Sequence, residues 1–355
     1  METIGRKVAK VITRLKNNCK AAMPNTYQRI RKIWHWVRRP YDHIVYSEKH
    51  VSYGEENPDK TFYLIPSYQY ASFGAVLNVP VLSGIRHALQ RKWIPVLDFL
   101  SMDNWFIEKD EIGIVNGWEQ YFFQPMDYSV GDVARSKHVI IPNKYFLYEG
   151  PSPCKAFFYN EFGMRDEWKK IYARYIRLKP EIEAYIEDKR KALHIEDGIR
   201  TVGVKCRGTD YSKRRTYGHQ IQPDTASIIE QTQRVMQEYG CSKVFLSCED
   251  EDIRRDFEAK LGAKLIMSEP AVEYDGCSIL YGKETGKFQD NLEYLCSLAI
   301  VSRCTCIVAT ACGGSMVSAL MAKNPEYEYY YCIGLYGIDD KNEEQKKRID
   351  LEDIE

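Results

Sequence analysis

The sequence predicts an α/β protein built from two Rossmann-like domains that face a central cleft. From Thr61 onward, short apolar runs typical of strands alternate with amphipathic stretches typical of helices, as in parallel sheets whose strands are joined by helices. A chain of 355 residues is long enough for two cores, and 44% hydrophobic against 28% charged residues is an ordinary globular composition. We expect a basic arm at 1–55, a first domain at 56–195, a second domain at 196–335 and a charged tail at 336–355.

The first domain is expected to open with a strand, a helix and a second strand. An apolar run at 61–67 precedes a helical pattern at 73–93 and another apolar run, which is the order of a βαβ unit in a parallel sheet. Its crevice is expected near Gly74, which would let a ligand approach the backbone. Asn78 on the same helix is a second candidate for the acceptor side of the cleft. A polar helical stretch at 167–194 then leads to the second domain.

The second domain is organised around the strand pattern that ends at Arg207. Further strand patterns alternate regularly with helical patterns as far as residue 334. Three strand ends, at Arg207, at Glu249 with Asp250, and at Thr310 to Ser315, are expected to open on one crevice. The reason is that the carboxyl ends of parallel strands meet at the same edge of a sheet.

Charged residues at the first of these strand ends suit a phosphate site. Arg207 carries a planar guanidinium, the group best shaped for two-point contact with a phosphate, and Asp210 follows in the next turn. The alternative is an ordinary surface pair at a loop, which contributes little to stability. Asp210 has two candidate roles: it accepts a proton from an acceptor hydroxyl, or it orients Arg207 through a salt bridge.

The turn after the strand CIVAT is made of small residues. Its sequence TACGGS, with Thr310, Cys312, Gly313 and Ser315, leads directly into a helical pattern, whose N-terminal N–H groups and dipole would face an anion. It is neither a Walker loop nor a GxGxxG fingerprint. With Arg207 on a neighbouring strand, it would give two independent anion holders, which suits a diphosphate.

Acidic residues follow the strand KVFLSC directly. Asp250, Glu251 and Asp252 fit either an acid-x-acid metal clamp or the negative charge favoured in the first turn of a helix. His219 is a candidate base or sugar contact, and the alternative is a packed histidine. The 11 cysteines show neither zinc nor disulfide-framework spacing, so we expect a reduced, cytoplasmic chain.

The first 50 residues carry a strong positive charge, although the whole chain is neutral. They contain twelve Lys and Arg against Glu2, Asp42 and Glu48, a surplus of nine, and apolar residues recur among them at helical spacing. Such a basic amphipathic helix binds an anionic membrane surface or packs against the body of the protein. The start has no apolar core of signal-peptide length, so we expect a cytoplasmic protein, peripheral on the inner face of the cell membrane, with no nucleic-acid partner.

Motifs in a fixed order mark the second domain: VGVKCRGTDY, GHQIQPD, VFLSCEDEDI and the run from Leu292 to Met321. This set resembles that of the α-1,6-fucosyltransferase and protein O-fucosyltransferase superfamily, which includes bacterial surface-polysaccharide enzymes, over roughly residues 200–325. The stretches GAVLNVPVLSGIRHALQ and WEQYFFQP resemble its first domain more loosely. The resemblance implies a GT-B fold that transfers a sugar from a nucleotide diphosphate without a metal ion.

The resemblance also implies roles for individual residues. Arg207 stands where the family's arginine holds the β-phosphate, and we place His219 on the same donor side. Glu249 and Asp250 correspond to acids that shape the donor site. The turn that caps the diphosphate corresponds to Thr310, Cys312 and Gly313, with Ser315 close by.

This chain departs from the family pattern at several positions. Gly208 replaces a second arginine, Lys205 a histidine that contacts guanine, Ser297 an acid that reads guanine, and Arg215 the glutamate proposed as base. GDP-fucose is the leading donor, and no other cofactor is expected. We expect a fucosyltransferase that acts on a glycan or lipid-linked oligosaccharide in cell-surface polysaccharide synthesis. The alternatives are a transferase for another nucleotide sugar and a catalytically silent nucleotide-sugar or glycan-binding protein.

Overall fold

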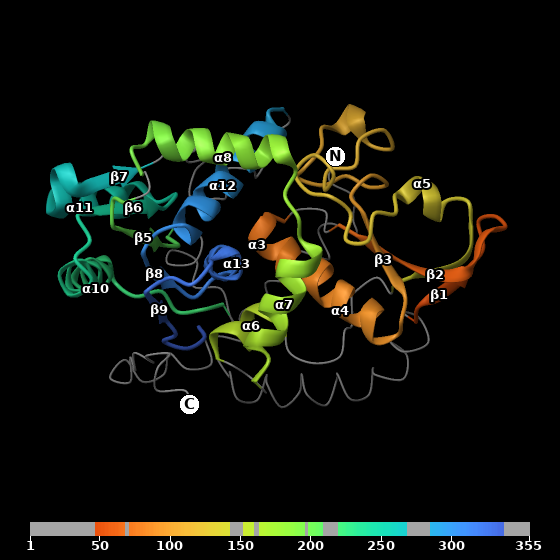
Figure 1. Cartoon of the computed structure of the whole chain (residues 1–355), viewed down its shortest axis with the longest axis horizontal. Helices are drawn as coiled ribbons and strands as arrows, with labels where there is room; N and C mark the ends of the chain where they lie inside the picture. The colour runs from red at the N-terminus through yellow and green to blue at the C-terminus, as the bar shows by residue number, and fades with distance from the viewer. Residues whose placement is uncertain are drawn as a thin grey trace, which may run out of the picture. The chain divides into compact units, whose positions relative to one another are not determined.

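The computed structural model describes residues 47–67, 71–142, 152–159, 163–195, 198–208, 219–267 and 285–336. Those from His50 onward belong to one compact unit, which contains two separate sheets with helices against them (Figure 1). The predicted α/β architecture is confirmed. None of the described helices is long and apolar enough to cross a bilayer. Most of the basic arm and the charged tail lie outside the described residues.

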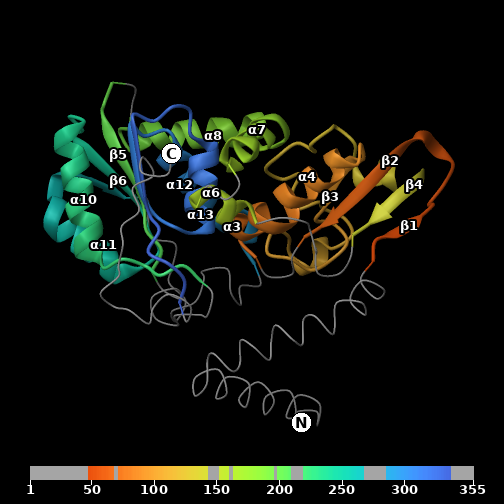
Figure 2. The same cartoon turned by 90° about the horizontal axis from the view of Figure 1, so that it is seen from below.

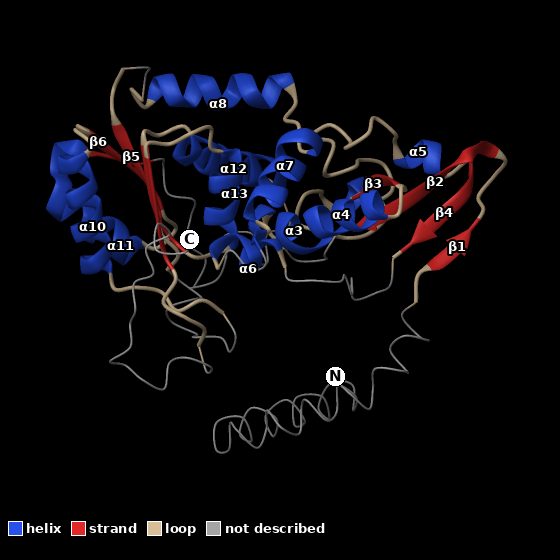
Figure 3. Cartoon of the chain, turned by 60° about the horizontal axis from the view of Figure 1, so that its bottom comes forward, coloured by secondary structure: helices blue, strands red, loops and turns tan. Residues whose placement is uncertain are grey.

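The first sheet has the strand order β1-β4-β2-β3. Its strands are β1 (Lys49–Val51), β2 (Glu56–Pro66), β3 (Ile94–Asp98) and β4 (Ser136–Ile141). The central strand β2 runs parallel to both β3 and β4. Side chains alternate across it, so Tyr63 belongs to the main core with α4 (Leu82–Gln90), while Phe62 packs in a small cluster with Val133 of α5 (Val130–Val133). Figure 3 shows these two helices beside the strands of the sheet.

The helix that joins β2 to β3 changes its winding along its length. It begins as α3 (Phe73–Val76), passes through a π-helical turn at Leu77–Val81 that contains Pro80, and continues as α4. Proline removes a backbone N–H from the helical ladder, and a π turn is one way to accommodate this locally. The strand–helix–strand unit predicted here is confirmed.

The single helical stretch expected at 167–194 is wrong. The structure has two helices there, α7 (Arg165–Tyr175) and α8 (Pro180–Ala192), after a short α6 (Pro153–Phe158). Pro180 occupies the first turn of α8, where its missing N–H costs nothing and its fixed backbone angle favours a helix start. The chain between the helices is extended, and Leu178 bridges to Phe122.

The second sheet has the order β7-β6-β5-β8-β9, and all its neighbouring strands are parallel. The strands are β5 (Thr201–Lys205), β6 (Lys243–Ser247), β7 (Leu265–Met267), β8 (Cys306–Thr310) and β9 (Tyr327–Tyr331). Figure 2 shows α10 (Thr225–Glu238) and α11 (Glu251–Leu261) on one side of it and α12 (Lys287–Ser302) and α13 (Gly313–Met321) on the other. The chain builds outward from β5 in both directions, so the strand order reverses between β5 and β8.

Helices α3 and α13 meet through glycine backbones. The two helices are in contact and lie next to each other between the sheets in Figure 1. A Cβ placed on Gly74 would lie 2.7 Å from the Gly314 nitrogen, and one placed on Gly313 would lie 2.7 Å from the Gly74 carbonyl oxygen. The helices approach this closely because neither glycine carries a side chain.

Candidate active site

The candidate site lies at the carboxyl ends of β5 and β8, where the strand order of the second sheet reverses. In open α/β sheets, the ligand crevice forms at such a point because the connecting segments diverge on either side of it. Lys205 at the end of β5 pairs in register with Ala309 of β8. Beyond these strands, the backbone N–H of Arg207 donates a hydrogen bond of 3.2 Å to Thr310 Oγ1. Two of the predicted strand ends are thus joined directly.

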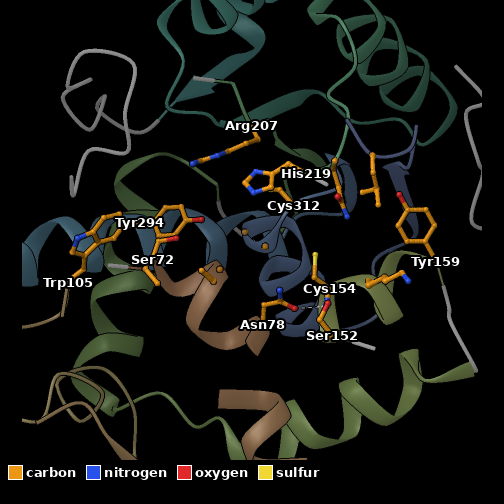
Figure 4. A pocket seen from close by; sticks show the side chains of 18 residues that line it. Ser72, Asn78, Trp105, Ser152, Cys154, Tyr159, Arg207, His219, Tyr294 and Cys312 are labelled. Carbon is orange, nitrogen blue, oxygen red and sulfur yellow. Dashed lines mark hydrogen bonds between the residues drawn. The ribbon is translucent and has the colours of Figure 1, made fainter. Parts of the chain in front are cut away.

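A cavity of about 550 Å³ opens at this point and is lined from both halves of the chain. Figure 4 shows Trp105 and Tyr294 on one side of Arg207 and Tyr159 on the other. The lining residues from the first half are Ala71, Ser72, Gly74, Ala75, Asn78, Trp105, Ser152, Cys154, Lys155 and Tyr159. Those from the second half are Arg207, His219, Gln220, Tyr294, Cys312, Gly313, Gly314 and Leu335.

A group of three charges lies beneath the cavity wall. Glu249 follows β6, and its Oε2 atom lies 3.5 Å from Arg207 Nη1 while its Oε1 atom lies 3.3 Å from Lys205 Nζ. Burial opposes ionisation of Glu249, but the charges of Lys205 and Arg207 outweigh it and lower the pKa of the carboxyl. Burial likewise opposes the charge of Lys205, yet the Glu249 carboxylate raises the pKa of that ammonium. All three groups are therefore charged, with a net charge of one positive unit.

The N-terminus of α13 provides a second positive feature at the same cavity. Gly313 and Gly314 form its first turn and line the cavity, and the described turn carries no acidic side chain. The helix is preceded by Cys312, whose Sγ lies 3.2 Å from Ser315 Oγ. Backbone N–H groups of a first helical turn lack partners within the helix and carry partial positive charge. Arg207 and this helix end would therefore attract the same anion.

Comparisons with known proteins give distant structural likenesses. No protein-family model matches the sequence, and no curated protein matches it. A crystal structure of NodZ alpha-1,6-fucosyltransferase co-crystallized with GDP is 14% identical, covers 74% of this chain and 93% of its own, and has a TM-score of 0.44. POFUT1 in complex with GDP-fucose is 13% identical, covers 78% and 99%, and has a TM-score of 0.45. Fucosyltransferase NodZ from Bradyrhizobium gives a TM-score of 0.42 at 14% identity, with coverage of 74% and 93%.

We infer the role of each residue from this chain's own cavity. Six of the residues predicted from the sequence line that one cavity. They are Gly74, Asn78, Arg207, His219, Cys312 and Gly313.

Other predicted residues do not line the cavity but contact residues that do. Thr310 and Ser315 are 1% and 0% exposed, and they contact Arg207 and Cys312 as described above. Glu249 acts on the cavity through its contact with Arg207. Asp210, the candidate proton acceptor, lies outside the described residues, as does Arg215.

Two first-half residues do more than line the cleft. The side of Gly74 on which a side chain would stand is occupied by the backbone of Gly313 and Gly314, while Gly74 also lines the cavity. The side-chain oxygen of Asn78 accepts a hydrogen bond of 2.7 Å from the Cys154 N–H. Asn78 thus fixes the start of α6 and with it one wall of the cavity.

The acids at 250–252 are engaged with the helix that follows them. Asp250 Oδ1 accepts hydrogen bonds from the N–H groups of Asp252 and Ile253 at 3.1 and 3.3 Å, which makes it the N-cap of α11. Gly208 leaves room for it, because a Cβ there would lie 2.4 Å from the Asp250 side chain. Within the described residues, no group of three or more metal-binding side chains is found. The contacts favour the helix-start interpretation of these acids over the metal clamp.

Replacing Asp250 with alanine is expected to lower the free energy of unfolding by about 1 kcal/mol, because α11 loses its cap. Asp250→Asn should keep nearly full stability, since an asparagine oxygen caps as well as a carboxylate. Urea unfolding of the three proteins measures both values. An equal loss in both variants would contradict the capping role and point to a need for the negative charge.

Several cavity residues were not predicted from the sequence as site residues. Tyr294 lies on α12, and burial raises the pKa of its phenol to about 12, so it is a neutral donor. Trp105 lies in the long segment after β3, held by a hydrogen bond of 2.8 Å from the Asn291 amide to its carbonyl oxygen. Its position in the motif run from Leu292 to Met321 was a usable signal for Tyr294. No local pattern marks Trp105, because its position depends on the hydrogen bond from Asn291 of α12.

Proposed function

We propose that this protein is a glycosyltransferase that takes its sugar from a nucleotide diphosphate, with GDP-fucose as the leading donor. The observation that carries the proposal is the placement of Arg207 beside the N-terminus of α13 in a cavity of about 550 Å³. A diphosphate that leaves a sugar gains negative charge in the transition state. Fixed positive groups at that position stabilise it without reorganisation.

The remaining chemistry is a proton transfer from the acceptor hydroxyl. Asp210 is our candidate for the group that takes the proton. Its place in the sequence, three residues after Arg207, supports the proposal. A role in orienting Arg207 is the alternative for the same carboxylate.

Among the described residues, the structure offers two groups for the diphosphate of the donor, Arg207 and the N-terminus of α13, but no assigned contact for its nucleobase. Lys205, at the position of the family's guanine-contacting histidine, is only 1% exposed and pairs with Glu249. Its ammonium is therefore turned to the protein interior. This observation favours a second candidate function, a transferase that uses another nucleotide sugar.

A panel of nucleotides tests the proposal. We expect nucleoside diphosphates to raise the melting temperature, with a stabilisation of about 2.7 kcal/mol at a hundred times the dissociation constant. Nucleoside monophosphates should stabilise less, because they reach only one of the two anion holders. If no diphosphate shifts the melting temperature, the donor site is wrongly placed.

Release of GDP from GDP-fucose separates an enzyme from a silent binder. An active transferase hydrolyses its donor slowly when no acceptor is present, whereas a binding protein returns it intact. Tight GDP binding without any GDP release would support the catalytically silent alternative.

We expect this activity to survive EDTA. Arg207 and the N-terminus of α13 supply the positive charge that a metal ion supplies in other transferases. GDP release is measured after dialysis against EDTA, with and without added manganese. Complete loss that manganese restores would support the acidic clamp at 250–252 instead.

The acceptor is proposed to be a glycan or a lipid-linked oligosaccharide of cell-surface polysaccharide synthesis, met at the inner membrane surface. Two features support this: the aromatic residues of the cavity, which suit sugar rings, and the basic arm in the sequence. Each Lys or Arg near an anionic surface contributes about 1 kcal/mol before screening. We expect the full chain to float with anionic vesicles at low salt. A chain lacking residues 1–45 should remain in the unbound fraction and still bind the nucleotide. A full chain that fails to float would overturn the membrane proposal.

A further inference from the structure

The buried ammonium of Lys205 lies next to the candidate diphosphate site but faces away from it. It donates a hydrogen bond of 3.4 Å to the Ser247 carbonyl oxygen, and it lies 5.6 Å from the ring centroid of Tyr294. A Cβ on Gly314 would lie 3.2 Å from Lys205 Cε, so the first turn of α13 covers the side chain. A ligand in the cavity would therefore meet Gly314 and Arg207 before it met Lys205.

Glu249 is shared between Lys205 and Arg207 through its two oxygens. Oε1 lies 3.3 Å from Lys205 Nζ, within hydrogen-bond distance. Oε2 lies 3.5 Å from Arg207 Nη1, and within the described part of the chain this buried oxygen accepts no hydrogen bond. Lys205 thus holds the carboxylate more closely than Arg207 does.

This unequal sharing matters because Glu249 is negatively charged, as is the proposed diphosphate ligand. A carboxylate held by Arg207 alone would neutralise the guanidinium and compete with a phosphate for it. With Lys205 present, part of the Glu249 charge is directed to the ammonium, so Glu249 orients Arg207 with less than its full charge.

We propose that Lys205 is a positioning residue that restrains Glu249, so that Glu249 holds Arg207 less tightly when a nucleoside diphosphate binds. The proposal rests on the proposed function and deepens it. Lys205 stands where the family has a histidine that contacts guanine. In this chain, we assign Lys205 a role in the diphosphate site, without contact to the base of the nucleotide.

A double-mutant cycle with GDP as the probe tests the proposal. We expect Lys205→Met to weaken GDP binding about tenfold, because the carboxylate of Glu249 then interacts with Arg207 alone. Titration calorimetry measures the affinity. In the Glu249→Gln background, the same Lys205→Met change should alter the affinity less than about threefold. An equal loss in both backgrounds would mean that Lys205 acts independently of Glu249 and would overturn the proposal.

The pH dependence of binding gives a readout that a merely structural role would not move. Lys205→Met removes the nearest positive charge from Glu249, so the pKa of its carboxyl should rise and GDP affinity should recover as the pH falls. The other groups that interact electrostatically with Glu249 are Arg207, Cys206, Cys248 and Tyr294, and Asp250 follows it in the chain. Burial raises the pKa of Cys248 and of Tyr294 to about 12 and that of Cys206 well above its usual value, so these three stay neutral.

The pH profiles are compared between variants, because the imidazole of His219 also lines the cavity. The recovery at low pH should be present in Lys205→Met and absent both from the wild type and from the double variant. The same profile in all three proteins would overturn the proposal.

Lys243→Met is a matched control for the loss of a lysine in this sheet. Its ammonium donates a hydrogen bond to the Ala263 carbonyl oxygen at 2.8 Å, at the opposite end of β6, and GDP affinity should not change. If Lys205→Met does not fold, the variant that combines Lys205→Met with Glu249→Gln is used instead, because it has no unpaired carboxylate. Its GDP affinity is compared with that of Glu249→Gln alone. GDP affinities within about threefold of each other support the proposal, and a tenfold difference overturns it. A wild type that binds neither GDP nor pyrophosphate would instead contradict the proposed function itself.

Discussion

Arg207→Ala is expected to abolish sugar transfer and to weaken GDP binding by about 1.5–3 kcal/mol, because it removes charge-assisted hydrogen bonds to the diphosphate. The loss corresponds to an affinity roughly 10- to 150-fold lower. Arg207→Lys should recover only part of it, since an ammonium cannot reproduce the two-point contact of a guanidinium. Titration calorimetry with GDP measures the binding, and GDP release from GDP-fucose measures the activity.

Arg200→Ala is the matched control for this experiment. Arg200 precedes the same strand, but its guanidinium pairs with Glu326 and donates to the Tyr239 carbonyl oxygen at the opposite end of the sheet. GDP affinity should not change in this variant. Unchanged affinity in Arg207→Ala as well would show that the diphosphate is not held at the end of β5.

Gly74→Ala and Gly313→Ala are each expected to lower the free energy of unfolding by about 1–3 kcal/mol, because a Cβ at either position overlaps backbone atoms of the other helix. The direction of the change is informative, because replacing a glycine in a helix with alanine normally raises the free energy of unfolding by about 1 kcal/mol. Backbone atoms cannot swing aside as a side chain does, so the overlap should outweigh this gain.

Gly131→Ala in α5 is the control for the two glycine variants. A Cβ there would meet its nearest atom, Ser129 Oγ, at 3.4 Å, so its stability should be unchanged or slightly higher. Urea unfolding with a common slope compares the three proteins. Equal or greater stability of Gly74→Ala would show that the contact between α3 and α13 is looser than the structure indicates.

The elements that position the site could be predicted where a local pattern determines them. The strand that ends before Arg207 and the helix that begins at Gly313 each follow from an apolar run and a turn of small residues. Parallel pairing then brings their ends together without further information. This is why Arg207, Cys312 and Gly313 were predicted to share one crevice.

Other features depend on contacts that no local pattern reports. Asp250 has the same sequence appearance whether it binds a metal or caps a helix, and the positions of the Asp252 and Ile253 N–H groups decide between these. The close approach of Gly74 to Gly313 joins segments far apart in the chain. The break before Pro180, in contrast, was predictable, because proline disfavours a helical conformation in the residue before it.

The central place of β5 has a consequence for how the protein is made. Lys205 meets the Ser247 carbonyl 42 positions later, and Arg207 meets Thr310 after a further long stretch, 103 positions from itself. Contacts of such sequence separation form slowly, because the entropy of closing long loops is lost before the contacts form. At about 5–20 residues per second, β8 leaves the ribosome many seconds after β5. Until β8 emerges, the edge of β5 that pairs with β8 would be exposed, with Arg207 just beyond it. A chaperone would bind in this state, and a chain truncated before β8 would remain in it.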